Sequence, residues 1–595
     1  MGKKIIFVLL LLLAGTTLLL IYEHRRGRGE AMEHAMMELT RLYRKSIRFG
    51  ADLSGVKRAT GLILNAQSAL DAGDEGSALR FMNEAIDVLR GLRATYDREW
   101  SILISTKKPS NNLYSGWWLE GPIYEVNIDL YPNRKFSEVT RDIPRLKELG
   151  IKTIYLMPVW YGIGYGIWDY FRLNPEYGSP SDLKELVDTA HKNGIRVLFD
   201  LVICQTPFFS YIYEEHPEWL IHTEDTSILK QSGIKVTDQY MILRGKFIFY
   251  QGELAGQILK DGRVILRHYP HLEWGWAINM TNEEVIEYFV SVATYYIREY
   301  DIDGWRVDAP QNNYNPLIVK GDHSALQLLR KIKEAITNLK PHSILFTEWD
   351  GPLSERSHFQ GEQSEPLFDE VAEISYDWPF SGWLRNFEFW NGFLAKVIRN
   401  QITSHDLVEF FTSQRILYNR SRVRFFNNHD TDRVQTAFPQ FHRNLLVLIS
   451  TAPGIPMIYV GDEIGTFRLN EINWERPDEE MEEFYRRIFR IRENSLPLKF
   501  GSIHDVWAGG DNAYAYLRSY QGDNVVIVLN FQGRPISVTL SLPVELMRID
   551  EASDYELIDA LSGDTRLLKG SELRSFRVQL DGNSALILLI MKGSK

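Results

Sequence analysis

Apolar and polar residues follow a different rhythm in successive regions of the chain. Over 30–105, apolar residues recur at steps of three and four, the spacing of one helix face. The segment DAGDEG at 71–76 interrupts this spacing and is typical of a turn. We therefore expect a helical hairpin or small bundle over 30–105, with a linker at 107–112. The apolar positions of its two helices are Leu62, Ala66, Ala69 and Leu70, then Ala78, Leu79, Met82, Ala85, Ile86 and Leu89.

After the linker, short apolar strands alternate with amphipathic helices. Eight strands, most of them followed by a helix or a long insert, predict a (β/α)8 TIM barrel at 113–500. The stretch 206–280 is too long for a strand-to-helix loop and predicts a subdomain inserted after the third strand. Short β-rich runs over 501–595 predict a C-terminal antiparallel β-sandwich. The expected barrel strands are Ile123–Asn127, Thr153–Pro158, Arg196–Val202, Gly304–Asp308, Ser343–Glu348, Glu373–Asp377, Val423–Asn428 and Pro456–Val460.

The first 29 residues have the pattern of a membrane anchor or a signal sequence. An uncharged, mostly apolar run at 5–22 lies between basic residues, and a helix of about 18 residues spans roughly 27 Å, close to the thickness of a bilayer core. The only cluster of small residues lies inside the run, which favours an uncleaved anchor over a cleaved signal. We expect a membrane-anchored protein with an extracytoplasmic catalytic body, or a secreted one if the segment is cleaved.

Composition limits the possible partners. With 44% hydrophobic and 24% charged residues, the chain can form a large packed core. Its net charge of −11 argues against a nucleic-acid partner, which would need clustered Lys and Arg. Cys204 is the only cysteine, so an internal disulfide and a cysteine-based zinc cluster are excluded.

Four short segments at the ends of predicted strands concentrate the candidate chemistry. They read FDLVICQ, DGWRVDAP, LFTEWDG and FFNNHDTDR. In a barrel of parallel strands the carboxyl ends of all strands meet on one face, so residues that are distant in the sequence converge there. The candidate residues in these segments are Asp200, Arg306, Asp308, Glu348, His429 and Asp430.

Asp308 and Glu348 are the natural pair for cleaving a glycosidic bond with retention, which needs a nucleophile and a general acid/base about 5 Å apart. Arg306 precedes Asp308 by two residues and lies on the same strand face, where its charge should favour the ionised carboxylate that a nucleophile requires. Trp349 follows Glu348, and an apolar neighbour should raise the pKa of that carboxyl. The His-Asp pair of the fourth segment could bind sugar hydroxyls and hold the ring distorted.

The region from about 113 to 595 resembles the α-amylase family, glycoside hydrolase family 13, because the four segments match its four signature regions. The segments NPEYGSPSDLKELVDTAHKNGIRVLFD and PGIPMIYVGDEIG are similar too. The resemblance implies that Asp308 is the nucleophile, Glu348 the general acid/base and Asp430 the transition-state stabiliser. The residues expected to contact or support the substrate are Tyr165, Asp200, Gln205, Arg306 and His429.

Two departures from the family pattern affect the expected metal and substrate contacts. The first region of the family usually ends in Asn-His, whereas this chain has Cys204-Gln205, and Gln205 can still hydrogen-bond the sugar. The Asn commonly binds the calcium of α-amylases, and cysteine is a poor ligand for that hard cation. Gln311 and Asn312 also replace the usual Lys-His after the nucleophile. We therefore expect no metal at the common calcium site and no cofactor, and leave a calcium site elsewhere open.

Together these features predict a retaining enzyme that cleaves α-1,4 bonds of maltooligosaccharides or related α-glucans. Hydrolysis and glycosyl transfer share a covalent glycosyl-enzyme intermediate, and the sequence does not choose between them. The α-linkage rests on the resemblance alone. The alternative is a non-catalytic, amylase-like ectodomain that acts as a membrane-anchored scaffold or binds carbohydrate. In either case the helical segment could dock a protein partner or form an inert stalk.

Overall fold

The chain divides into two compact units, Met1–Asn111 and Asn112–Lys595, and each has a hydrophobic core of its own. The computed structural model describes residue 35 and residues 53–89, 116–207, 210–223, 242–243, 247–250, 253–258, 264–266, 275–310, 324–348, 368–385, 389–417, 421–465, 472–510 and 513–593.

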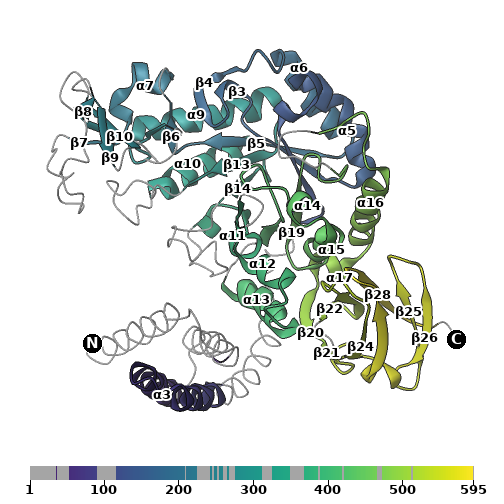
Figure 1. The fold of residues 1–595 in the computed structure, drawn as a ribbon. Helices are drawn as coiled ribbons and strands as arrows, with labels where there is room; N and C mark the ends of the chain where they lie inside the picture. Colours follow the sequence, from purple (N-terminus) through teal and green to yellow (C-terminus); the bar gives the residue numbers. More distant parts are fainter. Residues whose placement is uncertain are drawn as a thin grey trace. The chain divides into compact units, whose positions relative to one another are not determined.

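The described part of the first unit includes two consecutive helices, α3 (Leu53–Asp71) and a second one over 75–89 (Figure 1). Gly73, with a φ of 76°, lies in the turn between them. The Asp74 side chain accepts a hydrogen bond from the backbone N–H of Ser77 at 3.0 Å, and this bond caps the second helix. Both helices turn their apolar faces into one core, in which the fully buried residues are Ala59, Ile63, Ala66, Ala78, Met82, Ala85 and Leu89.

The predicted localisation needs correction. Crossing a bilayer takes about 20 consecutive apolar residues, and no helix in the part of the chain that the structure describes is long and apolar enough. The longest of them, α3, has 19 residues, but its sequence includes the charged Lys57, Arg58 and Asp71. The apolar run at 5–22 lies outside the described residues. Because no described helix could cross a membrane, the prediction of a membrane-anchored or secreted extracytoplasmic body is not upheld.

Eight parallel strands close into a barrel in the order β1-β19-β18-β15-β14-β13-β5-β2, so the predicted (β/α)8 core is confirmed. The strands are rich in apolar residues because helices cover the outside of the barrel and side chains fill its inside. Their bounds are β1 (Ile123–Val126), β2 (Thr153–Leu156), β5 (Arg196–Val202), β13 (Gly304–Asp308), β14 (Ile344–Thr347), β15 (Ile374–Tyr376), β18 (Ser421–Arg424) and β19 (Ile455–Tyr459).

Helices surround the strands (Figure 1). The start of α6 shows how the sequence sets these elements: Pro180 is its first residue, and Ser179 and Asp182 form a reciprocal capping box. The main helices are α5 (Phe136–Leu149), α6 (Pro180–Lys192), α9 (Glu283–Tyr300), α10 (Ser324–Leu339), α13 (Ser404–Leu417), α15 (His442–Thr451) and α16 (Glu479–Glu493). Shorter ones are α11 (Trp378–Ser381), α12 (Phe393–Ile398), α14 (Val434–Ala437) and α17 (Leu496–Phe500).

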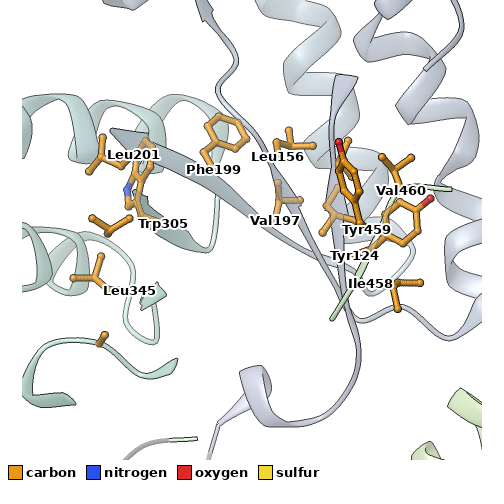
Figure 2. Packing of buried hydrophobic residues seen from close by; sticks show 14 of the residues in the cluster. Tyr124, Leu156, Val197, Phe199, Leu201, Trp305, Leu345, Ile458, Tyr459 and Val460 are labelled. Atoms are coloured by element: carbon orange, nitrogen blue, oxygen red, sulfur yellow. The ribbon is translucent and has the colours of Figure 1, made fainter. Parts of the chain in front are cut away.

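The strand residues alternate between two buried layers, as the period of two requires. Outward residues such as Val197, Phe199 and Trp305 belong to the large core between strands and helices (Figure 2). Inward residues such as Leu198 and Phe346 form a separate cluster inside the barrel. Asp200, Arg306 and Asp308 take inward positions nearer the carboxyl ends of β5 and β13 than Leu198 of this cluster.

Two inserted segments follow the carboxyl ends of barrel strands β2 and β5. The first is a hairpin after β2, formed by β3 (Trp160–Ile163) and β4 (Gly166–Leu173). The second follows β5 and contains β6 (Gln205–Thr206), α7 (Tyr211–Glu215) and a five-stranded sheet in the order β7-β11-β10-β9-β8. The strands of that sheet are β7 (His222–Thr223), β8 (Ile242–Leu243), β9 (Phe247–Tyr250), β10 (Glu253–Ile258) and β11 (Val264–Leu266). Pairing of β12 (Trp276–Ala277) with β6 closes this insert.

The C-terminal region consists of two antiparallel sheets that share a hydrophobic core. One has six strands in the order β20-β22-β23-β28-β25-β26, and the other has three in the order β21-β24-β27. The first sheet comprises β20 (Ser502–Asp505), β22 (Tyr514–Tyr520), β23 (Asp523–Leu529), β25 (Asp554–Asp559), β26 (Thr565–Lys569) and β28 (Ala585–Lys592). The second comprises β21 (Trp507–Gly510), β24 (Ile536–Ser541) and β27 (Phe576–Leu580).

Candidate active site

The predicted site residues come from neighbouring barrel strands. In the parallel pairing of β5 with β13, Arg306 lies opposite Asp200 and Asp308 opposite Val202. Glu348 directly follows β14, which pairs with the other side of β13. The segment after β18 supplies His429 and Asp430. The strand order therefore brings together residues that are more than 200 positions apart in the sequence.

Arg306 connects three of the carboxyl groups. Its Nη1 lies 2.9 Å from both carboxylate oxygens of Asp200 and 2.7 Å from Oδ1 of Asp308. Its Nη2 lies 3.0 Å from Oε2 of Glu348. The side chain is completely buried. A planar guanidinium can hold several carboxyl groups in fixed directions, and this one holds Asp308 and Glu348 beside each other.

The backbone after Asp308 also orients Glu348. The backbone N–H of Ala309 donates to Oε2 of Glu348 at 2.9 Å. Ala309 has a φ of 34°, which is unusual for a residue with a Cβ. Such strain, on the order of 1–3 kcal/mol, is found where the surrounding structure enforces it, often at functional sites. The turn at Ala309 thus directs its backbone N–H toward the carboxyl group of Glu348.

Tyr165 and His429 form a stacked pair at the other side of the site. Tyr165 lies in the turn of the β3–β4 hairpin and donates its hydroxyl to Oδ2 of Asp200 at 2.7 Å. The two rings are 5.2 Å apart and inclined by 18°, and the Tyr165 hydroxyl is 2.8 Å from Nε2 of His429. Oδ2 of Asp430 lies 3.4 Å from the same nitrogen. Through Tyr165 the hairpin thus contacts both Asp200 on β5 and His429 in the segment after β18.

A buried carboxylate holds the segment that carries His429 and Asp430. Asp462, which is fully buried, accepts hydrogen bonds from Asn427 at 3.0 Å and from Arg433 at 2.7 Å. Both donors belong to the segment 427–433 and flank the two site residues. Asp462 therefore fixes the segment at both of its ends.

Burial dominates the electrostatics of the acidic residues. It raises the pKa of Asp308 to about 7, although Arg306 opposes the shift. Burial likewise raises the pKa of Asp200 to about 6 and raises the pKa of Glu348. Arg306 favours the ionised form of Asp308, as the sequence predicted, but desolvation and the neighbouring acids outweigh this one shared guanidinium.

Sequence reasoning missed two residues beneath this group, Glu125 and Tyr155. Glu125 at the end of β1 is fully buried, and its Oε1 accepts a hydrogen bond from Nδ1 of His429. The Tyr155 hydroxyl lies 3.3 Å from the same oxygen and 3.2 Å from Oδ2 of Asp200. The available signal was the sequence IYEVN, in which a charged residue occupies the same strand face as Ile123.

Comparisons with known proteins identify the family of the chain. More than half of the chain, residues 136–227 and 271–495, matches the family model described as alpha amylase, catalytic domain. The chain belongs to the alpha-amylase family. The family predicted from the four strand-end segments is thereby confirmed.

Two curated relatives show how similar this family member is to known proteins. A cyclomaltodextrinase from Thermoanaerobacter pseudethanolicus is 28% identical over 406 residues, which are 65% of this chain and 62% of the relative. A maltogenic alpha-amylase from Bacillus acidopullulyticus is 24% identical over 479 residues, 76% of this chain and 72% of the relative. The chain thus spans less than two thirds of the length of the first of these relatives.

Solved structures show the same fold. An Anoxybacillus alpha-amylase aligns with a TM-score of 0.60 at 19% identity, over 80% of this chain and 99% of that one.

Two residues that depart from the family pattern lie at the start of the insert. Gln205 is buried, with 1% of its surface exposed, and its backbone pairs with Ala277. Its Oε1 is buried and has no hydrogen-bond partner among the residues that the structure describes. Burial, aided by Asp308 and Glu348, raises the pKa of the Cys204 thiol well above its usual range. The contact of Gln205 with sugar stays a prediction.

The expected lack of the common calcium site also stays a prediction. Within the described ranges, His, Cys, Asp and Glu side chains form no group of three or more that could hold a metal ion. Gln311 and Asn312, which replace the family's usual Lys-His, lie outside those ranges. Trp349, which was expected to raise the pKa of Glu348, lies outside them too.

Proposed function

We propose that this member of the alpha-amylase family is a retaining glycosidase that cleaves α-1,4 bonds of maltooligosaccharides or related α-glucans. The observation that carries the proposal is the guanidinium of Arg306, which touches Asp308 at 2.7 Å and Glu348 at 3.0 Å. Two carboxyl groups held side by side are what a double-displacement mechanism requires. The names of the relatives, cyclomaltodextrinase and maltogenic alpha-amylase, support an α-glucan substrate.

In the first step, a carboxylate oxygen of Asp308 attacks the anomeric carbon as the glycosidic bond breaks, and Glu348 gives its proton to the leaving oxygen. The backbone N–H of Ala309 donates to Oε2 of Glu348, and Nη2 of Arg306 lies 3.0 Å from the same oxygen. The transferable proton therefore sits on Oε1. In the second step, Glu348 takes a proton from water, whose oxygen replaces Asp308 at the anomeric carbon. A sugar hydroxyl in place of water gives transfer.

The surrounding residues bind and orient the sugar in this proposal. Asp430 is more exposed than the other acids, with 22% of its side chain accessible, and it can reach sugar hydroxyls. Tyr165 offers an aromatic face, and its stacking on His429 fixes the direction of that face. Asp200 keeps Arg306 and Tyr165 in place through hydrogen bonds to both.

The direct test is product analysis of the full chain incubated with maltoheptaose. Shorter sugars alone would indicate hydrolysis, and longer sugars as well would indicate transfer. We expect Asp308→Asn to abolish turnover with no loss of folding. Asp564→Asn, which makes the same chemical change at an exposed position in the C-terminal region, should retain full turnover.

Near-normal turnover by Asp308→Asn would contradict the mechanism. No turnover by the wild type on maltoheptaose or other α-glucosides would instead favour a carbohydrate-binding protein without catalysis. The departures at Cys204 and Gln205 are the features that fit that alternative. The helical unit remains a proposed docking element for a protein partner.

A further inference from the structure

Glu125 is a fully buried acid beneath the candidate site that the proposed double displacement does not use. It lies near the end of β1, in an inward position, and its Oε1 accepts hydrogen bonds from Nδ1 of His429 and from the Tyr155 hydroxyl. Its Oε2 is also buried and has no hydrogen-bond partner among the described residues. A buried carboxylate is expensive unless it is paired with a cation, and His429 is the group in contact with it.

The hydrogen bonds around His429 define where its protons must be. Tyr165 has a single hydroxyl hydrogen, which it donates to Asp200. The 2.8 Å contact between that hydroxyl and Nε2 of His429 therefore needs a hydrogen on Nε2. A carboxylate only accepts, so the contact of Glu125 with Nδ1 needs a hydrogen on that nitrogen as well. Only the imidazolium form of His429 meets both conditions.

We propose that Glu125 is a positioning residue, which holds the His429 ring in place and keeps it doubly protonated for the glycosidase activity proposed above. The interaction starts a chain of donors and acceptors that runs from Glu125 through His429 and Tyr165 to Asp200. Asp200 in turn bonds Arg306, which holds the two reacting carboxyl groups.

The other charged groups that face His429 are consistent with this assignment. Asp430 follows it in the same segment, Glu348 lies at the end of β14, and Arg306 lies on β13. Burial and Arg306 lower the pKa of His429, but Asp430 and Glu125 outweigh them and raise it to about 9. The imidazolium is thus the form present at neutral pH.

Loss of the Glu125 charge should rearrange this chain of hydrogen bonds. A neutral His429 with its hydrogen on Nδ1 leaves Nε2 as an acceptor. The Tyr165 hydroxyl would then donate to Nε2 and no longer to Asp200. Asp200 would lose one of its donors, and His429 would no longer offer an N–H toward the sugar position.

The test is an NMR titration of histidine-labelled full-length protein, with the His429 signal among the 14 histidines assigned by its loss in His429→Gln. In Glu125→Gln the shape and the acceptor for Nδ1 remain while the charge is lost. We expect the pKa of His429 to fall by about one unit or more, and the alkaline limb of kcat/KM to move to lower pH by a similar amount. Tyr155→Phe removes the other contact to Oε1 but keeps the charge, so it should leave the pKa of His429 raised.

Three results would overturn the inference. A pKa of wild-type His429 near the ordinary value of about 6.5 would overturn the inference before any variant is made. An unchanged pKa in folded Glu125→Gln would do so as well. A lowered pKa with an unchanged alkaline limb would refute the functional part. The titration is read whether or not the protein turns over maltoheptaose, so failure of the proposed function would be recognised separately.

Discussion

At the scale of single residues, the site is a group of buried acids that share few cations. Arg306 contacts Asp200, Asp308 and Glu348 at once, so none of them has a cation to itself. The sequence predicted that Arg306 and Asp308 share a strand face, because that follows from the period of two. It did not predict the raised pKa of Asp308, because burial depends on segments that are distant in the sequence and cover the strand ends.

The pH dependence of stability provides a test of this burial. The pKa of Asp308 is about 7 in the folded protein, whereas an unfolded Asp titrates near about 4, so the folded state binds the proton more tightly. The contribution of this carboxyl to the free energy of unfolding is therefore complete below about pH 4 and is lost as the pH rises through about 7.

We accordingly expect the wild type to lose on the order of 2 kcal/mol relative to Asp308→Asn between about pH 5 and pH 8. Urea unfolding of both proteins across this range measures the difference. A difference that does not change with pH would show that Asp308 is not desolvated as described.

At the scale of elements, the position of the catalytic residues depends on the loops that follow the strands. Asp462 follows β19 and fixes the segment 427–433 after β18 through Asn427 and Arg433. The sequence PGIPMIYVGDEIG pointed to the family, but its pattern does not reveal which neighbouring loop Asp462 contacts. Strand pairing could be predicted from the barrel pattern, whereas contacts between loops depend on how the closed barrel places their side chains.

Asp462→Asn should weaken both the fold and the activity. It leaves the buried guanidinium of Arg433 without its carboxylate, which typically costs about 3–5 kcal/mol. Because the segment that carries His429 and Asp430 loosens, kcat should fall at least about tenfold. Urea unfolding and steady-state kinetics on maltoheptaose measure the two effects.

The matched control is Asp478→Asn. Asp478 caps the start of α16 by accepting a hydrogen bond from the backbone N–H of Met481 at 3.0 Å. Asn caps helices about as well as Asp, so both stability and kcat should stay close to wild type. Equal effects of the two substitutions would argue against a special contribution of Asp462.

At the scale of the whole molecule, the barrel and the C-terminal sheets belong to one compact unit. Tyr516 and Ile527 of the six-stranded sheet belong to the same hydrophobic core as the barrel helices. Arg518 donates to the backbone carbonyl groups of Thr451 and Gly501. The sequence predicted a separate C-terminal β-region from its strand pattern. It could not show the shared core, because the outward face of those strands is as apolar as the inward one.

This organisation predicts different outcomes for two truncations. Residues 112–595 should fold, unfold in a single calorimetric transition and retain turnover of maltoheptaose, because the helical unit has its own core. Removal of 501–595 from this fragment should abolish folding, because it exposes the apolar surface shared with the barrel. A folded, active barrel without the C-terminal sheets would contradict the single-body description.

The most direct test of the central claim is to trap the glycosyl-enzyme intermediate. In Glu348→Gln, an α-maltosyl fluoride can still react, since fluoride leaves without a proton, but water is no longer activated for the second step. We predict that mass spectrometry of the digested protein finds the maltosyl group on the peptide that contains Asp308. An unlabelled Asp308 peptide, or a label on another carboxylate, would contradict the account.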